Sequence, residues 1–166
     1  MAWTTTARSG RGRFGLLRDT ATVMSQEKVE IVRRQFEAFA QGGVDAAAVF
    51  WHPDIEWRAV EGAVDDIGVF KGRDAMARYY GDWADMVEDL RGEVTEVVYE
   101  SGEILVVVVS TSGHARGSNA PIHGRHSVVY TIRDGQIVRG REYETPEQAL
   151  EALELSKQRS GRRSSR

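Results

Sequence analysis

The stretch "VVYTIRDGQIVRGREYE" (residues 128–144) predicts two antiparallel strands joined by a tight turn. Apolar and polar residues alternate on both sides of "RDGQ" (133–136), and Gly135 can adopt the positive φ that short hairpin turns require. The segment "TPEQ" (145–148) has the pattern of a helix start, with a threonine N-cap and proline at the first helical position. We therefore expect a hairpin followed by a helix that ends at Leu155.

Upstream of this hairpin, the spacing of apolar residues changes from a period of 3.6 to a period of two. Helices are predicted at residues 26–41, 44–51 and 71–90. Strands are predicted at residues 54–60, 92–101, 103–117, 123–133 and 136–144, and the acidic segment 61–70 is expected to be a loop. Helices followed by a run of strands indicate an α+β fold with a mostly antiparallel sheet.

The size and composition of the chain limit its class. The 166 residues suit one domain with a real core, and 41% hydrophobic and 28% charged residues are typical of a globular protein. The longest apolar run, "ILVVVV" (104–109), has the length of a strand, so no membrane-spanning segment is expected. The absence of cysteine excludes disulfides, thiolate catalysis and cysteine-ligated metals. The cytoplasm is the expected compartment.

The charges are unevenly distributed along the chain. The net charge is −3, but residues 1–23 carry +3 and residues 156–166 carry +5, so residues 24–155 carry −11. An acidic body argues against nucleic acid as the main partner. The two basic ends are expected to be disordered extensions, the second of them a solvated tail rather than a contact for an anionic polymer. The folded domain is expected at 24–155, because "MSQEKVEIVRRQF" from Met24 has the pattern of a natural beginning.

Three phrases point to a known family. They are "FEAFAQGGVDAAAVFWHPDIEW" (36–57), "FKGRDAMARYY" (70–80) and "VVYTIRDGQIVRGREYETPEQALEAL" (128–153). With the order of elements, they resemble the nuclear transport factor 2-like superfamily, and within it the SnoaL-like group, over residues 24–155. The resemblance implies a curved sheet wrapped around the helices, a cone-shaped pocket open at one end, and a homodimer on the outer face of the sheet.

The sequence of one predicted strand also favours the homodimer. In residues 104–109 both faces are apolar, whereas a half-solvated antiparallel strand alternates with polar residues. The second face must therefore be covered. A partner subunit is the predicted cover, and a packed terminus is the alternative.

The resemblance leaves the activity open, because the superfamily includes isomerases, polyketide cyclases, epoxide hydrolases, dehydratases and binding modules. The polar groups of ketosteroid isomerases correspond here to Ala59, Phe36 and Val128, so that chemistry is not expected in its known form. SnoaL-like cyclases use an aspartate with a nearby histidine. Those positions correspond here to Val128 and His114, so any acid–base machinery must be rearranged.

One candidate acid–base pair depends on the length of a turn. If residues 133–135 form a three-residue loop, His126 lies opposite Glu142 on the interior face. The carboxylate would raise the pKa of His126 and orient its ring, which suits a general acid or base. A two-residue turn would instead place His126 opposite Tyr143, and the pair would be lost.

The preceding hairpin could add a second histidine. A turn centred on Ala120 places His114 opposite His126, and the two imidazoles with Glu142 would have the residue types of a metal site. We expect no metal and no other cofactor, since His123 and His126 must point to opposite faces of one strand. The alternative is that these histidines are ordinary hairpin residues.

Several apolar side chains are expected to line the pocket and contact a flat, apolar molecule, with plain core packing as the alternative. They are Phe36, Trp57, Tyr80, Trp83, Val128 and Tyr130. Glu61, in the loop expected at the pocket mouth, is a reserve base.

The sequence thus predicts a homodimeric SnoaL-like cone that binds a small apolar or aromatic molecule, with no nucleic acid or membrane partner. Cofactor-free isomerisation, cyclisation or hydration would use His126 as acid or base and Glu142 to orient it. His114 or Tyr130 would contact the substrate oxygen. The alternative is a non-catalytic ligand-binding or dimerisation module of the same fold.

Overall fold

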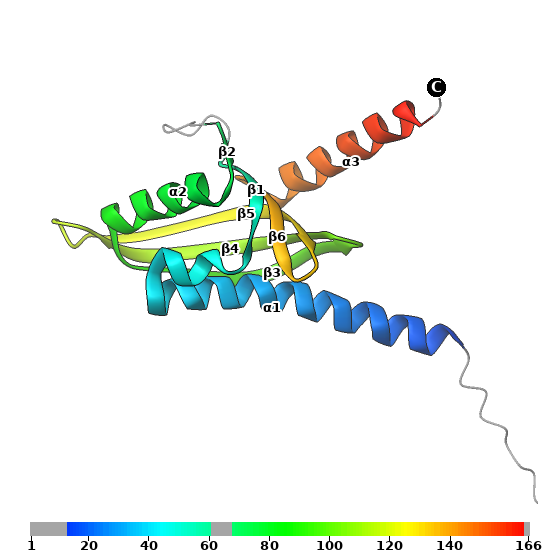
Figure 1. The fold of residues 1–166 in the computed structure, drawn as a ribbon, viewed down its shortest axis with the longest axis horizontal. Coiled ribbons are helices and arrows are strands. Elements are labelled where there is room, and N and C mark those ends of the chain that lie inside the picture. Colours follow the sequence, from blue (N-terminus) through cyan, green and yellow to red (C-terminus); the bar gives the residue numbers. More distant parts are fainter. Residues whose placement is uncertain (1–12, 61–67, 165–166) are drawn as a thin grey trace, which may run out of the picture.

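The computed structural model describes residues 13–60 and 68–164, with side chains from residue 26 onward. It has three helices and a curved, unclosed sheet of six strands, which confirms the α+β prediction (Figure 1). The elements are α1 (Arg13–Ala48), β1 (Trp51–Arg58), β2 (Val69–Lys71), α2 (Arg73–Met86), β3 (Val87–Ser101), β4 (Ile104–Ala115), β5 (Pro121–Arg133), β6 (Gln136–Tyr143) and α3 (Pro146–Arg163). No helix in the described part of the chain is long and apolar enough to cross a bilayer.

The strands lie in the order β2-β1-β6-β5-β4-β3. β1 runs parallel to β6, and every other neighbouring pair is antiparallel. Alternate residues of β4 and β5 enter two different cores. Val107 and Val128 belong to the main core with residues of α1 and α2, whereas Val106 and Val129 pack against Ala149 of α3 on the opposite face. Helices therefore cover both faces of the sheet.

The α3 packing explains why β4 is apolar on both sides. Val106 is fully buried, and Ala149 and Leu153 of α3 belong to the cluster that packs around it. A packed C-terminal helix, the alternative to a partner subunit, thus covers this part of the outer face. The homodimer stays a prediction.

Two helices differ from their predicted ranges at the N-terminal side of the fold. The helices expected at 26–41 and 44–51 form one element, α1, with a kink at Gly43, whose φ is +74°. The predicted domain start at residue 24 falls inside α1, and residues 1–12 and Glu61 lie outside the described residues. At the other end, α3 continues to Arg163, beyond the predicted end at Leu155.

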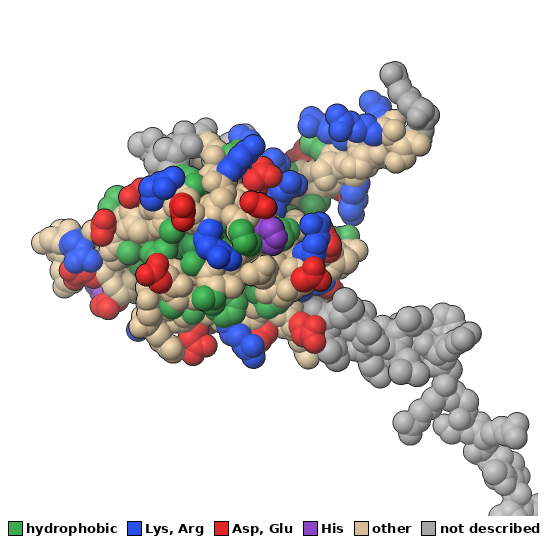
Figure 2. All heavy atoms as spheres, in the orientation of Figure 1, with side chains coloured by type: hydrophobic (Ala, Val, Ile, Leu, Met, Phe, Trp, Pro, Cys, Tyr) green, Lys and Arg blue, Asp and Glu red, His purple; other side chains and the backbone are tan. Residues whose placement is uncertain are grey.

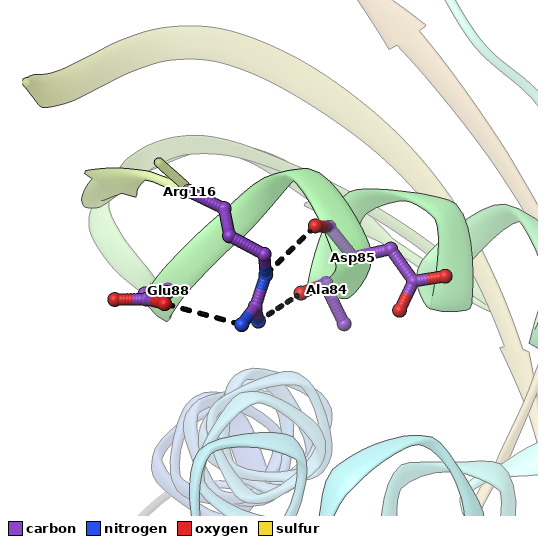
Figure 3. Close-up of polar contacts among 4 residues, drawn as sticks. All are labelled: Ala84, Asp85, Glu88 and Arg116. Atoms are coloured by element: carbon purple, nitrogen blue, oxygen red, sulfur yellow. Dashed lines mark hydrogen bonds and ion pairs between the residues drawn. The ribbon is translucent and has the colours of Figure 1, made fainter. Parts of the chain in front are cut away.

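Helix α2 ends earlier than predicted, at Met86, and the chain enters β3 without a loop. Arg116, from the β4–β5 hairpin, binds this helix end (Figure 3). Its guanidinium donates to the carbonyl oxygens of Asp85 at 2.9 Å and Ala84 at 3.1 Å, and it pairs with Glu88 at 3.1 Å. Carbonyls in the last turn of a helix have no intrahelical partner. Arg116 supplies hydrogen-bond donors to these carbonyls, which the short junction between α2 and β3 does not provide.

Candidate functional site

Glu142 lies near the end of β6, opposite Val128 of β5, and its side chain is on the interior face of the sheet. Its carboxylate accepts a hydrogen bond from Trp57 Nε1 at 3.0 Å. It also accepts from the Tyr79 hydroxyl, which lies 3.3 Å from Oε1 and 3.4 Å from Oε2. Two aromatic side chains, one from β1 and one from α2, therefore fix the position of this half-buried carboxylate.

Trp57 reaches Glu142 because β6 has a glycine beneath the indole. Trp57 pairs with Gly140 across the β1–β6 ladder, and a Cβ at Gly140 would lie 2.0 Å from the Trp57 ring. The indole therefore lies directly on the backbone of β6. The ring also meets Tyr130 edge to face, with ring centroids 5.7 Å apart.

Tyr79 is held as a hydrogen-bond donor. Its ring stacks on Phe70 at a centroid distance of 4.8 Å, and its hydroxyl accepts a hydrogen bond from the Trp83 side chain. Burial, and then the charge of Glu142, raise the pKa of Tyr79 far above its ordinary value. The hydroxyl therefore keeps its proton and can only donate to the carboxylate.

Tyr80 belongs to a neighbouring buried network. Trp51 Nε1 donates to Gln35 Oε1 at 3.0 Å, and Gln35 Nε2 donates to the Tyr80 hydroxyl at 3.3 Å. Burial and the charge of Glu142 raise the pKa of Tyr80 as well. This network ties α1 to α2 and β1 beside the carboxylate.

Tyr130 has a buried hydroxyl without a hydrogen-bond partner among the described residues. Burial, followed by the nearby Tyr80 and Glu142, raises its pKa, so this hydroxyl also stays protonated. A buried hydroxyl without a partner costs about 1–3 kcal/mol, which makes it a candidate for binding a ligand atom. We name Glu142 with Trp57, Tyr79, Tyr80 and Tyr130 the Glu142 cluster.

A groove of about 360 Å³ gives access to one side of the Glu142 cluster. Its lining includes Glu142, Ala59 and Tyr143 at the ends of β1 and β6. The carboxylate thus lies between the buried aromatic side chains and a surface opening.

A larger groove, of about 1,050 Å³, lies between α1 and the β3–β5 half of the sheet. Gly92, Thr111 and Gly124 are neighbours across its three strands, and Phe36 lies against Gly92. Glu142 does not line this groove. We place the candidate site at the Glu142 cluster, because a carboxylate and buried hydroxyls meet there among aromatic rings.

The structure does not pair His126 with Glu142. The turn has two residues, Asp134 and Gly135, with φ of +50° and +75°, and a one-residue bulge follows in the ladder at Val138. Glu142 therefore lies opposite Val128, and the predicted three-residue loop and His126–Glu142 pair are both wrong.

His126 is on the interior face, half-buried and opposite Val109. Burial lowers the pKa of His126, whereas the predicted carboxylate neighbour was expected to raise it. The imidazole is therefore neutral at neutral pH. His126 is a half-buried residue at the edge of the core and does not form an ion pair with Glu142.

His114 does not meet His126 either. The β4–β5 turn is centred nearer to Gly117 than to Ala120, so His114 lies opposite Pro121 and is exposed. Val106 and His114 are an even number of residues apart on β4, so His114 is on the outer face. The predicted His114–His126 pair is wrong, and no group of metal-ligating side chains occurs in the part of the chain that the structure describes.

The six predicted lining residues, by contrast, all belong to the main core. They are Phe36, Trp57, Tyr80, Trp83, Val128 and Tyr130. Tyr79 is the residue that the sequence did not single out for the site. Tyr79 and Tyr80 are adjacent on a helix and point in different directions, and only Tyr80 was expected to line the pocket.

Solved structures of the ketosteroid isomerase-like and nuclear transport factor 2-like class share this fold. One, from Catenulispora acidiphila DSM 44928 in complex with trimethylamine, gives a TM-score of 0.59 at 19% identity over 70% of this chain and 86% of its own. Another, from Jannaschia sp. CCS1 and provisionally named a SnoaL-like polyketide cyclase, gives 0.60 at 19% identity over 75% and 89%. At these identities the likeness shows the fold alone.

Comparison at the level of sequence identifies the family. An uncharacterised protein of Mycobacterium tuberculosis (strain ATCC 25618 / H37Rv) is 27% identical over 125 residues, which cover 75% of this chain and 94% of the relative. The SnoaL-like domain family matches residues 32–140. The chain belongs to this family, as the three sequence phrases predict.

Proposed function

We propose that this protein binds a small, largely apolar or aromatic molecule at the Glu142 cluster and moves a proton on it. One observation supports this most: a carboxylate, Glu142, is held among aromatic rings near a buried hydroxyl, Tyr130, that has no partner among the described residues. Such a pair offers a proton acceptor and a hydrogen-bond donor to one ligand.

In the proposed reaction, Glu142 takes a proton from a carbon next to a ligand carbonyl. The C–H bond breaks, an O–H bond forms on the carboxylate, and the electron pair moves onto the carbonyl oxygen. Tyr130 donates a hydrogen bond to that oxygen, while Trp57 and Tyr79 hold the carboxylate in place. Return of the proton to a different carbon gives an isomer. Attack of the carbanion on a second carbonyl carbon of the same molecule forms a C–C bond and breaks the π bond of that carbonyl, and the new alkoxide takes the proton from Glu142 to give a ring.

His126 takes a smaller part in this proposal than the sequence predicts. Its neutral ring is on the same face of β5 as Val128 and Tyr130, so we assign it a contact with the ligand and not the base. His114, exposed on the outer face, is left out of the site.

The test measures proton abstraction without knowledge of the natural substrate. 1-Indanone, an aromatic ketone with exchangeable protons next to its carbonyl, is incubated with the protein in D2O, and deuterium uptake is followed by NMR. We expect acceleration by the wild type, loss of that acceleration in Glu142→Gln, and a reduction of about 10²-fold in Tyr130→Phe. Glu144→Gln, at an exposed carboxylate two residues away, should exchange like the wild type. Equal exchange in Glu142→Gln and the wild type would refute Glu142 as the base.

One observation favours the second candidate, a binding protein without catalysis. Glu142 already accepts hydrogen bonds from Trp57 and Tyr79, and donors to a carboxylate lower its basicity. In that case, 1-indanone would quench the tryptophan fluorescence at saturating concentrations, with no deuterium uptake above background.

A further inference from the structure

Helix α3 has two dissimilar halves. Its first turns pack on the outer face of the sheet through Ala149 and Leu153, and the Lys157 ammonium donates to the Tyr99 hydroxyl at 3.3 Å. The second half extends away from the sheet, and its Lys and Arg side chains are gathered on the extending part (Figures 1 and 2). Leu155, at the middle of the helix, is 51% exposed.

The charges of α3 are arranged symmetrically about Leu155 and have opposite signs on its two sides. Glu151 and Arg159 are four residues before and after Leu155, and Glu147 and Arg163 are eight residues before and after it. Residues four apart form one ridge on the surface of a helix. All five side chains on this ridge are exposed.

This ridge is complementary to itself. In a two-fold symmetric pair, each residue i of one subunit faces residue j of the other, and j faces i. With the two Leu155 side chains on the axis and the helices antiparallel, Glu151 would face Arg159 of the partner subunit, about 6 Å along the helix from the centre. Glu147 would face Arg163 of the partner subunit at about 12 Å. A parallel pair would bring like charges together.

We propose that a second copy of this chain docks on α3, in an antiparallel pair centred on Leu155. The dimer predicted for this fold uses the outer face of the sheet, but α3 already covers the Val106 part of that face. Two short helices bury less than the roughly 1,200 Å² of a stable interface, so the pair is weak and forms at micromolar or higher concentrations. Its exposed ion pairs make it weaker in high salt.

Sedimentation velocity over a range of protein concentrations tests this dimer. We expect a reversible dimer that Leu155→Asp weakens at least tenfold. Glu147→Arg with Glu151→Arg makes the ridge entirely basic, and Arg159→Glu with Arg163→Glu makes it entirely acidic. Each double variant alone should be monomeric, and an equimolar mixture of the two should restore the dimer. Because the changed side chains are exposed, circular dichroism should show the fold unchanged in every variant.

A matched control separates a specific contact at Leu155 from the general effect of an aspartate at an exposed apolar position. Val97 of β3 is 45% exposed, and Val97→Asp should dimerise like the wild type. A wild type that stays monomeric at all concentrations would overturn the proposal, and so would a dimer that survives Leu155→Asp. A mixture of the double variants that remains monomeric would also overturn it. A monomer that associates only with added heparin would show that the basic half of α3 binds polyanions instead.

Discussion

At the scale of single residues, the site depends on a missing side chain as much as on those present. Gly140 leaves the space in which the Trp57 indole lies, and the indole in turn donates to Glu142. The position of the carboxylate therefore follows from a glycine two residues before it. A search of the sequence for polar side chains does not reveal this role of Gly140.

Gly140→Ala tests this dependence. The added Cβ would lie 2.0 Å from the Trp57 ring, so the indole must shift and its bond to Glu142 must lengthen or break. Overpacking of this kind costs about 1–3 kcal/mol in the free energy of unfolding, which urea denaturation would measure. Gly81→Ala, where the added Cβ meets nothing within 4 Å, is the control and should be neutral or slightly stabilising. Equal stability of the two variants would contradict this account.

His126 gives the fold a dependence on pH. Burial lowers its pKa in the folded state, so the unfolded chain takes up a proton at this residue at higher pH than the folded chain does. Stability contributed in this way is present above the ordinary histidine pKa of about 6.5 and is lost as pH falls below it, by about 1.4 kcal/mol per unit of pKa difference.

His126→Gln should therefore flatten the decline of unfolding free energy between about pH 7 and pH 5. Urea unfolding at several pH values measures that slope. His123→Gln, at an exposed histidine on the same strand, should leave the slope as in the wild type. A slope that both variants share with the wild type would mean that His126 titrates alike in the folded and unfolded chains.

The aromatic side chains of the site could be predicted because periodicity alone places them inside. Trp57 alternates with polar neighbours on its strand, Tyr130 follows Val128 at a spacing of two, and Tyr80 and Trp83 recur at helical spacing, so their burial follows from local pattern. Their contacts with Glu142 could not be predicted. These depend on which residues of three separate strands and a helix come into register.

At the scale of elements, the junction of α2 and β3 shows tertiary structure overriding local propensity. Residues up to Leu90 fit a helix by sequence, yet Val87 begins a strand that pairs with Ala115 of β4. Arg116, next to that pairing, donates to the last carbonyls of α2 (Figure 3). The strand pairing and the arginine together decide where the helix ends.

Arg116→Met should loosen this junction. The carbonyls of Ala84 and Asp85 would lose their side-chain donor and turn to water, at a cost of about 1 kcal/mol in unfolding free energy. Hydrogen exchange should rise at the amides of the last turn of α2. Arg125→Met removes an arginine whose ion pair with Glu96 is exposed and 3.7 Å long, so it should change neither quantity measurably. Unchanged exchange in Arg116→Met would show that strand pairing alone ends the helix.

The hairpin of β5 and β6 shows the limit of the sequence at this scale. Its two strands and its turn were predictable from alternation and from Gly135. The length of the turn was not, because Asp134 adopts a φ of +50°, which aspartate tolerates but does not require. No feature of the local sequence indicates the bulge at Val138, so the cross-strand partners of His126 and Glu142 could not be derived from the sequence.

At the scale of the whole molecule, the class of fold was predictable and its periphery was not. The order of elements and the three phrases correctly indicate a SnoaL-like sheet with helices. The cover of the outer face by α3 was only the alternative to the predicted partner subunit, and the continuation of α3 to Arg163 was not predicted. Long-range packing rather than helix propensity determines the first, and the absence of a proline after Leu155 permits the second.

The bulge at Val138 has a consequence for how this protein can change over time. If Val138 instead paired with Thr131, each position of β6 beyond it would move to the opposite side of the sheet, and Glu142 would point outward, opposite Ser127. The direction in which Glu142 points thus depends on whether Val138 is bulged or paired, as well as on the identity of the residues in β6. Loss of the Val138 codon would remove only the bulge, because Arg139 would then follow Ile137 and still pair with Thr131, and Glu142 would stay opposite Val128.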